Sequence, residues 1–93
     1  MYLHLGNDIA VNCNEIIGIF DMENTSIGKI TREFFKKSTK KNIIVNVSFD
    51  MPKSFVVCKK SNGDDVIYIT SLLTSTLLKR YKKSIKDKND IWR

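Results

Sequence analysis

The strongest constraint on the fold of this chain is an Asn62-Gly63 pair that separates two β-prone runs. The first run, Ser54–Lys59, follows a turn signal at Asp50 and Pro52, and the second occupies residues 66–70. Asn-Gly is the strongest short-range hairpin signal, because both residues tolerate the positive φ that a two-residue turn needs. The sequence therefore predicts a β-hairpin in the second half of the chain.

The rest of the chain supplies four more strand-like runs and two helical stretches. Short β-prone runs lie at residues 2–5, 9–11, 16–20 and 43–49, and Gly18 inside one of them predicts a bulge or a close contact. Apolar residues at helical spacing predict a central helix near 26–39 and a closing helix near 74–86. The order is β-β-β-α-β-β-β-α. With connections of hairpin length, it predicts an α+β fold with a small, mainly antiparallel sheet.

A chain of 93 residues accommodates one domain. We expect that domain over residues 1–86, followed by a frayed basic tail over 87–93 in which Trp92 either docks on a neighbour or is disordered. The two cysteines, Cys13 and Cys58, lie in strand-like runs and are expected to be reduced and buried. No apolar run approaches the roughly 20 residues of a membrane helix, and the N-terminus does not resemble a signal peptide. These features predict a cytoplasmic protein that does not bind membranes.

The net charge of +6 is distributed unevenly along the chain. Residues 79–93 hold seven basic side chains against two acidic ones, whereas residues 1–78 hold nine basic and eight acidic. Lysines also cluster between positions 36 and 41. Basic surfaces concentrate polyanions, of which DNA is the usual one in a bacterial cytoplasm. Alternatively, lysine-rich helix faces simply keep a small protein in solution, and both interpretations remain open.

The sequence offers few groups for catalysis. The single histidine, His4, shares a strand face with Tyr2, and its spacing from the cysteines indicates no nucleophilic pair. A C-x-x-C spacing typical of zinc sites is absent, and residues 62–65 lack the distal glutamate of a calcium loop. The scattered glycines form no phosphate-binding loop. The sequence therefore predicts a protein that is not an enzyme, with no metal, no cofactor and no evident small-molecule substrate.

Three segments carry a resemblance to a known family. They are the opening Met1-Tyr2-Leu3-His4-Leu5-Gly6, the triplet Pro52-Lys53-Ser54 and the helix start Ser75-Thr76-Leu77. The three segments, in this order, resemble the bacterial extracellular matrix (biofilm) regulators of the RemA/RemB type, which are also called domain of unknown function 370. The resemblance extends over residues 1–83. The motifs are most similar to the RemB branch. The resemblance implies a transcription-associated, DNA-binding regulator that assembles into rings or higher-order oligomers.

The DNA-binding positions of the family are not basic in this chain. The resemblance implies DNA contacts at an arginine before the third strand, where this chain has Glu15. It also implies an arginine pair before the fifth strand, where Met51 and Pro52 stand. Lys53 is the nearest cation, and a lysine lacks the bidentate fork of arginine. These departures predict that the family site does not bind phosphate here.

The basic residues of the closing helix and the tail predict that a DNA surface lies there. Lys79, Lys82, Lys83 and Lys86 follow the spacing of one helix face. The candidate nucleic-acid-binding residues are Lys53, Lys79, Arg80, Lys82, Lys83, Lys86 and Lys88. We expect self-association into a homo-oligomer through the first strand, with Tyr2 and His4, or through the closing helix, and the resemblance implies that this oligomer is ring-like. The alternative is a protein-interaction or assembly module that kept the fold and lost the basic DNA site.

Overall fold

The computed structural model describes residues 1–35 and 42–91, with side chains for 1–33 and 43–84. Within these ranges the elements are, in chain order, β1 (Tyr2–Gly6), β2 (Ile9–Asn12), the 3-10 helix η1 (Cys13–Glu15), β3 (Ile16–Asp21), α1 (Ile27–Phe35), β4 (Asn42–Asn46), β5 (Ser54–Lys59), β6 (Asp65–Thr70) and α2 (Thr74–Ile91). The predicted α+β class and the order of strands and helices are confirmed.

The strands form two sheets. β1 and β2 make a two-stranded antiparallel sheet, and the other four make a sheet in the order β3-β5-β6-β4. β5 is antiparallel to β3 and β6, whereas β4 runs parallel to β6. The parallel pair arises because β3 and β4 lie at opposite edges of the larger sheet, and the segment with α1 crosses over between them.

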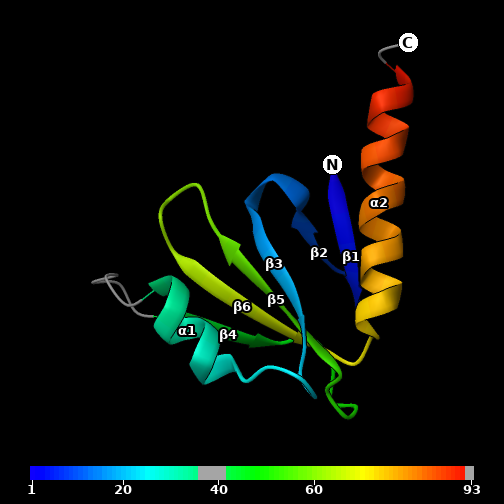
Figure 1. Cartoon of the computed structure of the whole chain (residues 1–93). Coiled ribbons are helices and arrows are strands. Elements are labelled where there is room, and N and C mark those ends of the chain that lie inside the picture. The colour runs from blue at the N-terminus through cyan, green and yellow to red at the C-terminus, as the bar shows by residue number, and fades with distance from the viewer. Residues whose placement is uncertain (36–41, 92–93) are drawn as a thin grey trace.

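The central strand β5 supplies both core layers. Phe55 and Val57 pack with Ile30 of α1 on one face of the larger sheet. Val56 and Cys58 pack on the other face, which is covered by β1, β2 and α2 (Figure 1). Because successive side chains of a strand point to opposite faces, one continuous apolar run can serve two layers. All four of these β5 side chains are fully buried.

The predicted hairpin and the close contact at Gly18 are confirmed, but the turn is not a two-residue Asn-Gly turn, because β5 ends at Lys59 and β6 begins at Asp65. At the β5–β6 hairpin, Gly63 has a φ of 93°, and its amide donates to the Lys60 carbonyl at 2.9 Å. The β3–β5 register shifts between Ile16 and Gly18. A Cβ at Gly18 would lie 2.6 Å from Cε2 of Phe20. A side chain at position 18 would therefore force the Phe20 ring to move.

The strand predicted over residues 43–49 is wrong at its end, because β4 stops at Asn46. The carbonyl of Val47 accepts a hydrogen bond of 2.7 Å from Nδ2 of Asn7. The Asp50 amide donates to Oγ of Ser48 at 3.1 Å, and the Phe49 side chain is fully exposed. The Val47 amide still donates to the Ile69 carbonyl of β6 at 2.9 Å, but its carbonyl is taken by the distant Asn7, and Ser48 forms a local bond that competes with a strand ladder. The bonds of Asn7 and Ser48 turn the chain away from the sheet edge.

One hydrogen-bond network joins the opening strand, Ser54 of the Pro52-Lys53-Ser54 triplet and Thr74, the residue that precedes Ser75-Thr76-Leu77. Oγ1 of Thr70 donates to the carbonyl of Leu5 in β1 at 2.7 Å and accepts from the Leu72 amide at 3.2 Å. Oγ of Ser54 donates to the Leu72 carbonyl at 2.8 Å, and it lies 2.7 Å from Oγ1 of Thr74, the first residue of α2. The network therefore ties the opening strand, the Pro52-Lys53-Ser54 triplet and the helix start together.

Both cysteines are free and buried, as predicted, although Cys13 begins η1 instead of lying in a strand. Burial raises the pKa of the Cys58 thiol from 9.0 to about 11. As the pH rises, the unfolded chain therefore loses this proton before the folded one does.

We expect the free energy of unfolding to fall between pH 9 and about 11, by about 3 kcal/mol for a shift of this size. Urea unfolding on both sides of this window measures the effect. In Cys58→Ala the same pH change should remove correspondingly less stability. An identical pH dependence in the two proteins would contradict the assignment to Cys58.

Candidate nucleic-acid interface

The helix α2 presents a basic face to solvent. Leu77 is fully buried, and Tyr81 packs against the same core cluster. At 3.6 residues per turn, Lys79 and Lys82 point away from this buried side. Together with Lys83 they are exposed, and none of the three forms an ion pair with another side chain in the described part of the chain. Three cations therefore remain available for an external anion.

Arg80 lies on the flank of α2 that faces β1. Its Nη1 donates a hydrogen bond of 3.1 Å to the carbonyl oxygen of His4. Lys83 and Ser84 line the same side of the helix, next to Tyr2 and His4. The alternation of residues in the first strand predicted that Tyr2 and His4 share one face. This is confirmed, because both are exposed whereas Leu3 and Leu5 are buried. The approach of α2 to that face was not foreseen.

The predicted end of the closing helix near residue 86 is too early, since α2 continues to Ile91. Residues 86–90 contain neither glycine nor proline, so nothing in them stops a helix. The predicted boundary at residue 87 falls inside this helix. The side chains of Lys86 and Lys88 lie outside the described residues, as do Trp92 and the lysine cluster of residues 36–41.

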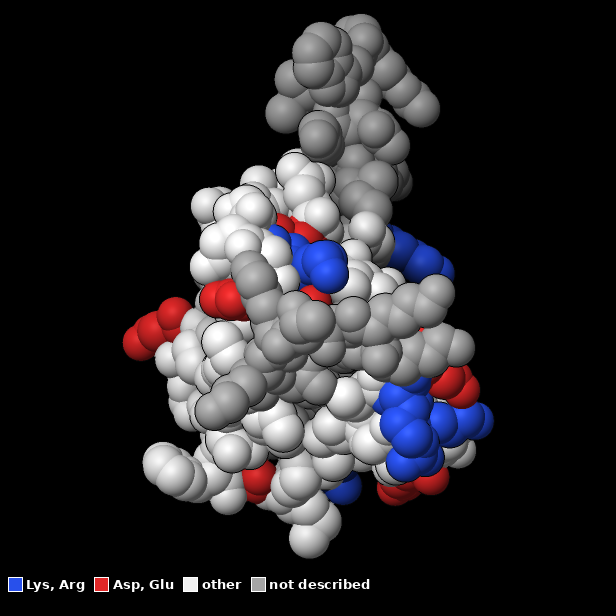
Figure 2. All heavy atoms as spheres, turned by 90° about the vertical axis from the view of Figure 1, so that its left-hand side faces the viewer, with Lys and Arg blue, Asp and Glu red and all other residues white. Residues whose placement is uncertain are grey.

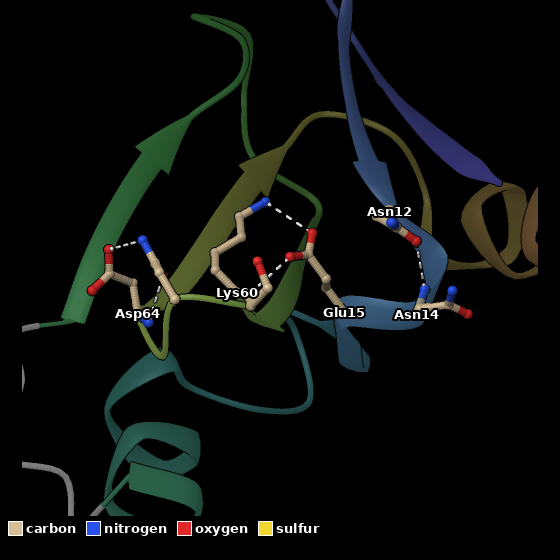
Figure 3. Close-up of polar contacts among 7 residues, drawn as sticks. Asn12, Asn14, Glu15, Lys60 and Asp64 are labelled. Carbon is tan, nitrogen blue, oxygen red and sulfur yellow. Dashed lines mark hydrogen bonds and ion pairs between the residues drawn. The ribbon is translucent and has the colours of Figure 1, made fainter.

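Glu15 has a defined structural partner. Asn12 caps η1, with the Asn14 amide donating to its Oδ1 at 3.0 Å, and this turn aims Glu15 at the β5–β6 hairpin (Figure 3). There the carboxylate lies 3.5 Å from Nζ of Lys60 and accepts from the Ser61 amide at 3.2 Å. The carboxylate thus joins the start of β3 to the hairpin. An arginine at this position would repel Lys60, and the structure gives a physical reason for the acidic residue.

Lys60 also contacts an aromatic ring. Its Nζ lies 5.2 Å from the ring centroid of Tyr68. Hydrogen bonding to Tyr68, with smaller contributions that include the Glu15 carboxylate, raises the pKa of Lys60 above 10.5. The lysine is therefore charged at neutral pH and neutralises Glu15. This group consequently adds no net positive charge for binding a phosphate.

Met51, Pro52 and Lys53 lie at the opposite end of the β3–β5 pair from Glu15. Asp21 pairs with Ser54 at this end, whereas Ile16 pairs with Cys58 at the other. Met51, Pro52 and Lys53 are all exposed. Lys53 borders a hollow whose other charged members are Asp21 and Glu23, so nearby carboxylates offset its charge. The structure therefore does not join the family positions into one basic site within a chain.

The rest of the described surface carries mixed charge. On the face shown in Figure 2, basic and acidic side chains are interspersed among uncharged ones. This agrees with the nearly equal numbers of basic and acidic residues in the sequence before position 79. The exposed lysines of α2 are therefore the principal basic group among the side chains that the structure describes.

No metal centre appears within residues 1–35 and 42–91, where no group of three potential ligands comes together. The hairpin acids serve the turn itself, since the Asp64 amide donates to Oδ1 of Asn62 at 2.9 Å and Nδ2 of Asn62 donates to Oδ2 of Asp64 at 3.1 Å. His4 is exposed on β1, whereas Cys58 is fully buried in β5.

Among the described helices, none is long and apolar enough to cross a membrane.

The fold and the exposed basic helix define a small α+β protein that pairs a two-stranded with a four-stranded sheet. No family model matches the chain. The chain is 40% identical over 80 residues to Extracellular matrix regulatory protein B of Bacillus subtilis (strain 168), which covers 86% of this chain and 89% of that protein. The chain therefore belongs to the RemA/RemB-like family of extracellular matrix regulatory proteins, and the resemblance seen in its motifs is confirmed.

Proposed function

We propose that this protein is a cytoplasmic regulator of extracellular matrix (biofilm) genes that binds duplex DNA through α2 as a homo-oligomer. The observation that carries the proposal is the exposed row of Lys79, Lys82 and Lys83 on α2. The name of the relative, an extracellular matrix regulatory protein, supports the regulatory role. The basic charge of residues 79–93 supports an anionic partner.

The chemistry of lysine favours binding that tolerates different DNA sequences. A lysine ammonium is a point charge that contacts phosphates, and phosphate contacts position a protein without reading bases. Each phosphate that is neutralised releases counterions and contributes about −0.9 to the slope of log K against log salt. Three cations per subunit give weak binding on their own. Repetition around an oligomer raises the overall affinity through multivalency.

Exposed apolar side chains support self-association at the β4 edge of the larger sheet. Ile43 and Ile44 of β4 are 44% and 54% exposed, and Met51 and Phe49 in the following segment are 74% and 106% exposed. β4 is an edge strand, and unpaired edges are sites where copies of a chain associate. Association here into a ring-like oligomer leaves α2 free for DNA. These exposed groups favour the β4 edge over the β1 and α2 surfaces that the sequence indicated.

Replacement of Lys79, Lys82 and Lys83 with glutamine should abolish retention on duplex DNA. Glutamine keeps the helix propensity of lysine but removes the charge. The slope of log K against log salt should become less negative by about 2.7 if all three contact phosphates. Fluorescence anisotropy with a labelled duplex, across a salt series, measures both the affinity and the slope.

A charge-matched control combines Lys29→Gln, Arg32→Gln and Lys53→Gln, three exposed cations outside α2. Lys53 is included although the sequence made it a candidate, because the carboxylates of Asp21 and Glu23 lie around the same hollow and offset its charge. This variant has the same net charge as the α2 variant but should retain most of the DNA affinity. Equal losses in the two variants would mean that net charge alone governs retention. A wild-type protein with no DNA affinity at low salt would refute the proposal.

The second candidate function is an assembly or protein-interaction module without DNA binding. The observation that favours it is Glu15, whose carboxylate is held by Lys60 and Ser61 where the family pattern has an arginine. On this alternative, light scattering would give a mass well above the 10.7 kDa of one chain, while DNA would not bind. A mass of one chain at high concentration would exclude both oligomeric proposals.

A further inference from the structure

A cleft of about 480 Å³ lies between β1 and α2, lined by Tyr2, Leu3, His4, Arg80, Lys83 and Ser84. It combines two cations and two aromatic rings, and no carboxylate is among the described residues that line it. The other hollows differ in chemistry. Those near Phe49 and Lys53 contain acidic residues, and the one between β3 and α2 has no charged side chain in its lining. The β1–α2 cleft therefore suits an anionic ligand with a flat ring.

The cationic side of the cleft is held in place. The guanidinium of Arg80 has five N–H donors, and the one on Nη1 that reaches the His4 carbonyl at 3.1 Å fixes it against β1. No other hydrogen bond of Arg80 occurs among the described residues, so its remaining donors are available to a ligand. Lys83 lies one turn after Arg80 at i+3, on the same flank of the helix, so both positive charges border one opening. Arginine and lysine together are typical phosphate-binding residues.

The opposite side of the cleft presents aromatic rings. Tyr2 is 60% exposed, and His4 lies two residues further along the same face of β1. Side chains two positions apart on a strand are separated by about 6.8 Å. That is about twice the roughly 3.4 Å between successive nucleotides of one stacked strand. The spacing leaves room for one flat base against Tyr2 and His4. The Ser84 hydroxyl adds a donor and acceptor for a base edge or a sugar.

We infer that the cleft binds a nucleoside phosphate, with the base against Tyr2 and His4 and the phosphate on Arg80 and Lys83. A volume of about 480 Å³ is within the roughly 300–1,000 Å³ range of small-molecule sites. The ligand is either a free nucleotide or an unpaired nucleotide of a strand, since both carry the same base and phosphate. This site does not depend on duplex binding by Lys79 and Lys82, which are not part of its lining.

Isothermal titration of the full chain with nucleoside 5′-monophosphates, and with inorganic phosphate, tests the inference. Tyr2→Ala should weaken nucleotide binding about tenfold, as expected for loss of a stacking ring, and should leave phosphate binding unchanged. Tyr2→Phe should bind like the wild type. Lys83→Gln should weaken both ligands. Since Tyr2 and Lys83 are exposed, the thermal midpoint of each variant should stay near that of the wild type.

The matched control is Lys79→Gln with Lys82→Gln, which removes two cations from α2 outside the cleft. It should lose duplex affinity but keep nucleotide affinity, which separates the two proposals. A 5′-phosphorylated single strand that binds far more tightly than the mononucleotide identifies a strand as the source, and equal affinity identifies the free nucleotide. The inference is overturned if the wild type binds no nucleotide, or if Tyr2→Ala binds it normally. It is also overturned if Tyr2→Ala dissociates the oligomer without changing nucleotide affinity.

Discussion

Replacement of Phe55 with alanine is expected to lower the free energy of unfolding by about 3–5 kcal/mol. The ring is fully buried in β5 and stacks on Phe20, with 5.3 Å between the ring centroids. It also belongs to the core cluster with Ile30 of α1 and Ile67 of β6. Truncation removes the largest fully buried side chain of the chain's described part and leaves a cavity that a close-packed core fills only in part. Urea unfolding followed by circular dichroism measures the change.

The chain provides a matched control in Phe49, which is fully exposed after β4. Phe49→Ala removes the same atoms from a surface position, so the free energy of unfolding should change by no more than about 0.5 kcal/mol. A similar loss in both variants would contradict the two-layer core. If the loss in Phe49→Ala grows with protein concentration, Phe49 is covered in the oligomer, as the proposed association at the β4 edge requires.

The elements of this fold were predictable where the signal is local. The hairpin follows from Asn62 and Gly63, and the alternation of β1 follows from its apolar and polar residues. Ser26 caps α1 through a bond of 3.1 Å from the Lys29 amide to its Oγ, in the polar stretch where the sequence predicted a cap. Such features depend on neighbouring residues, which a sequence displays directly.

The arrangement of the elements was less predictable because it depends on contacts between distant residues. The parallel pairing of β4 with β6 results from the crossover with α1, which strand composition does not encode. The early end of β4 depends on Asn7, which lies 40 residues away from the Val47 carbonyl that it binds. A run of β-branched residues alone could not reveal that this carbonyl has a side-chain partner.

The candidate sites show the same difference. Helical spacing correctly indicated that Lys79, Lys82 and Lys83 are exposed, since the apolar residues of α2 occupy another side. The β1–α2 cleft was missed, because Arg80 and His4 are 76 positions apart and only the packing of α2 on β1 brings them together. The sequence indicated only the aromatic side of the cleft, because the alternation of the first strand places Tyr2 and His4 on one face. It did not show which cations lie opposite them.

Replacement of Thr70 with valine is expected to lower the free energy of unfolding by about 2–4 kcal/mol, although the two side chains have nearly the same shape. Thr70 is 1% exposed, so water cannot replace its hydroxyl. Without Oγ1, the Leu5 carbonyl loses its 2.7 Å bond and the Leu72 amide loses its 3.2 Å bond. Each buried polar group left without a partner costs about 1–3 kcal/mol.

Thr70→Ser is the control, because it keeps the hydroxyl and removes one methyl group, which should cost about 1 kcal/mol. A larger loss for valine than for serine would show that the hydrogen bonds, and not the packing of the methyl group, join β1 to β6 and the start of α2. The reverse order would contradict this role. Since Ser54 bonds to the same Leu72 residue, Ser54→Ala in the Thr70→Val background should cost less than it does alone. Such coupling would explain physically why the three motif segments occur together in one chain.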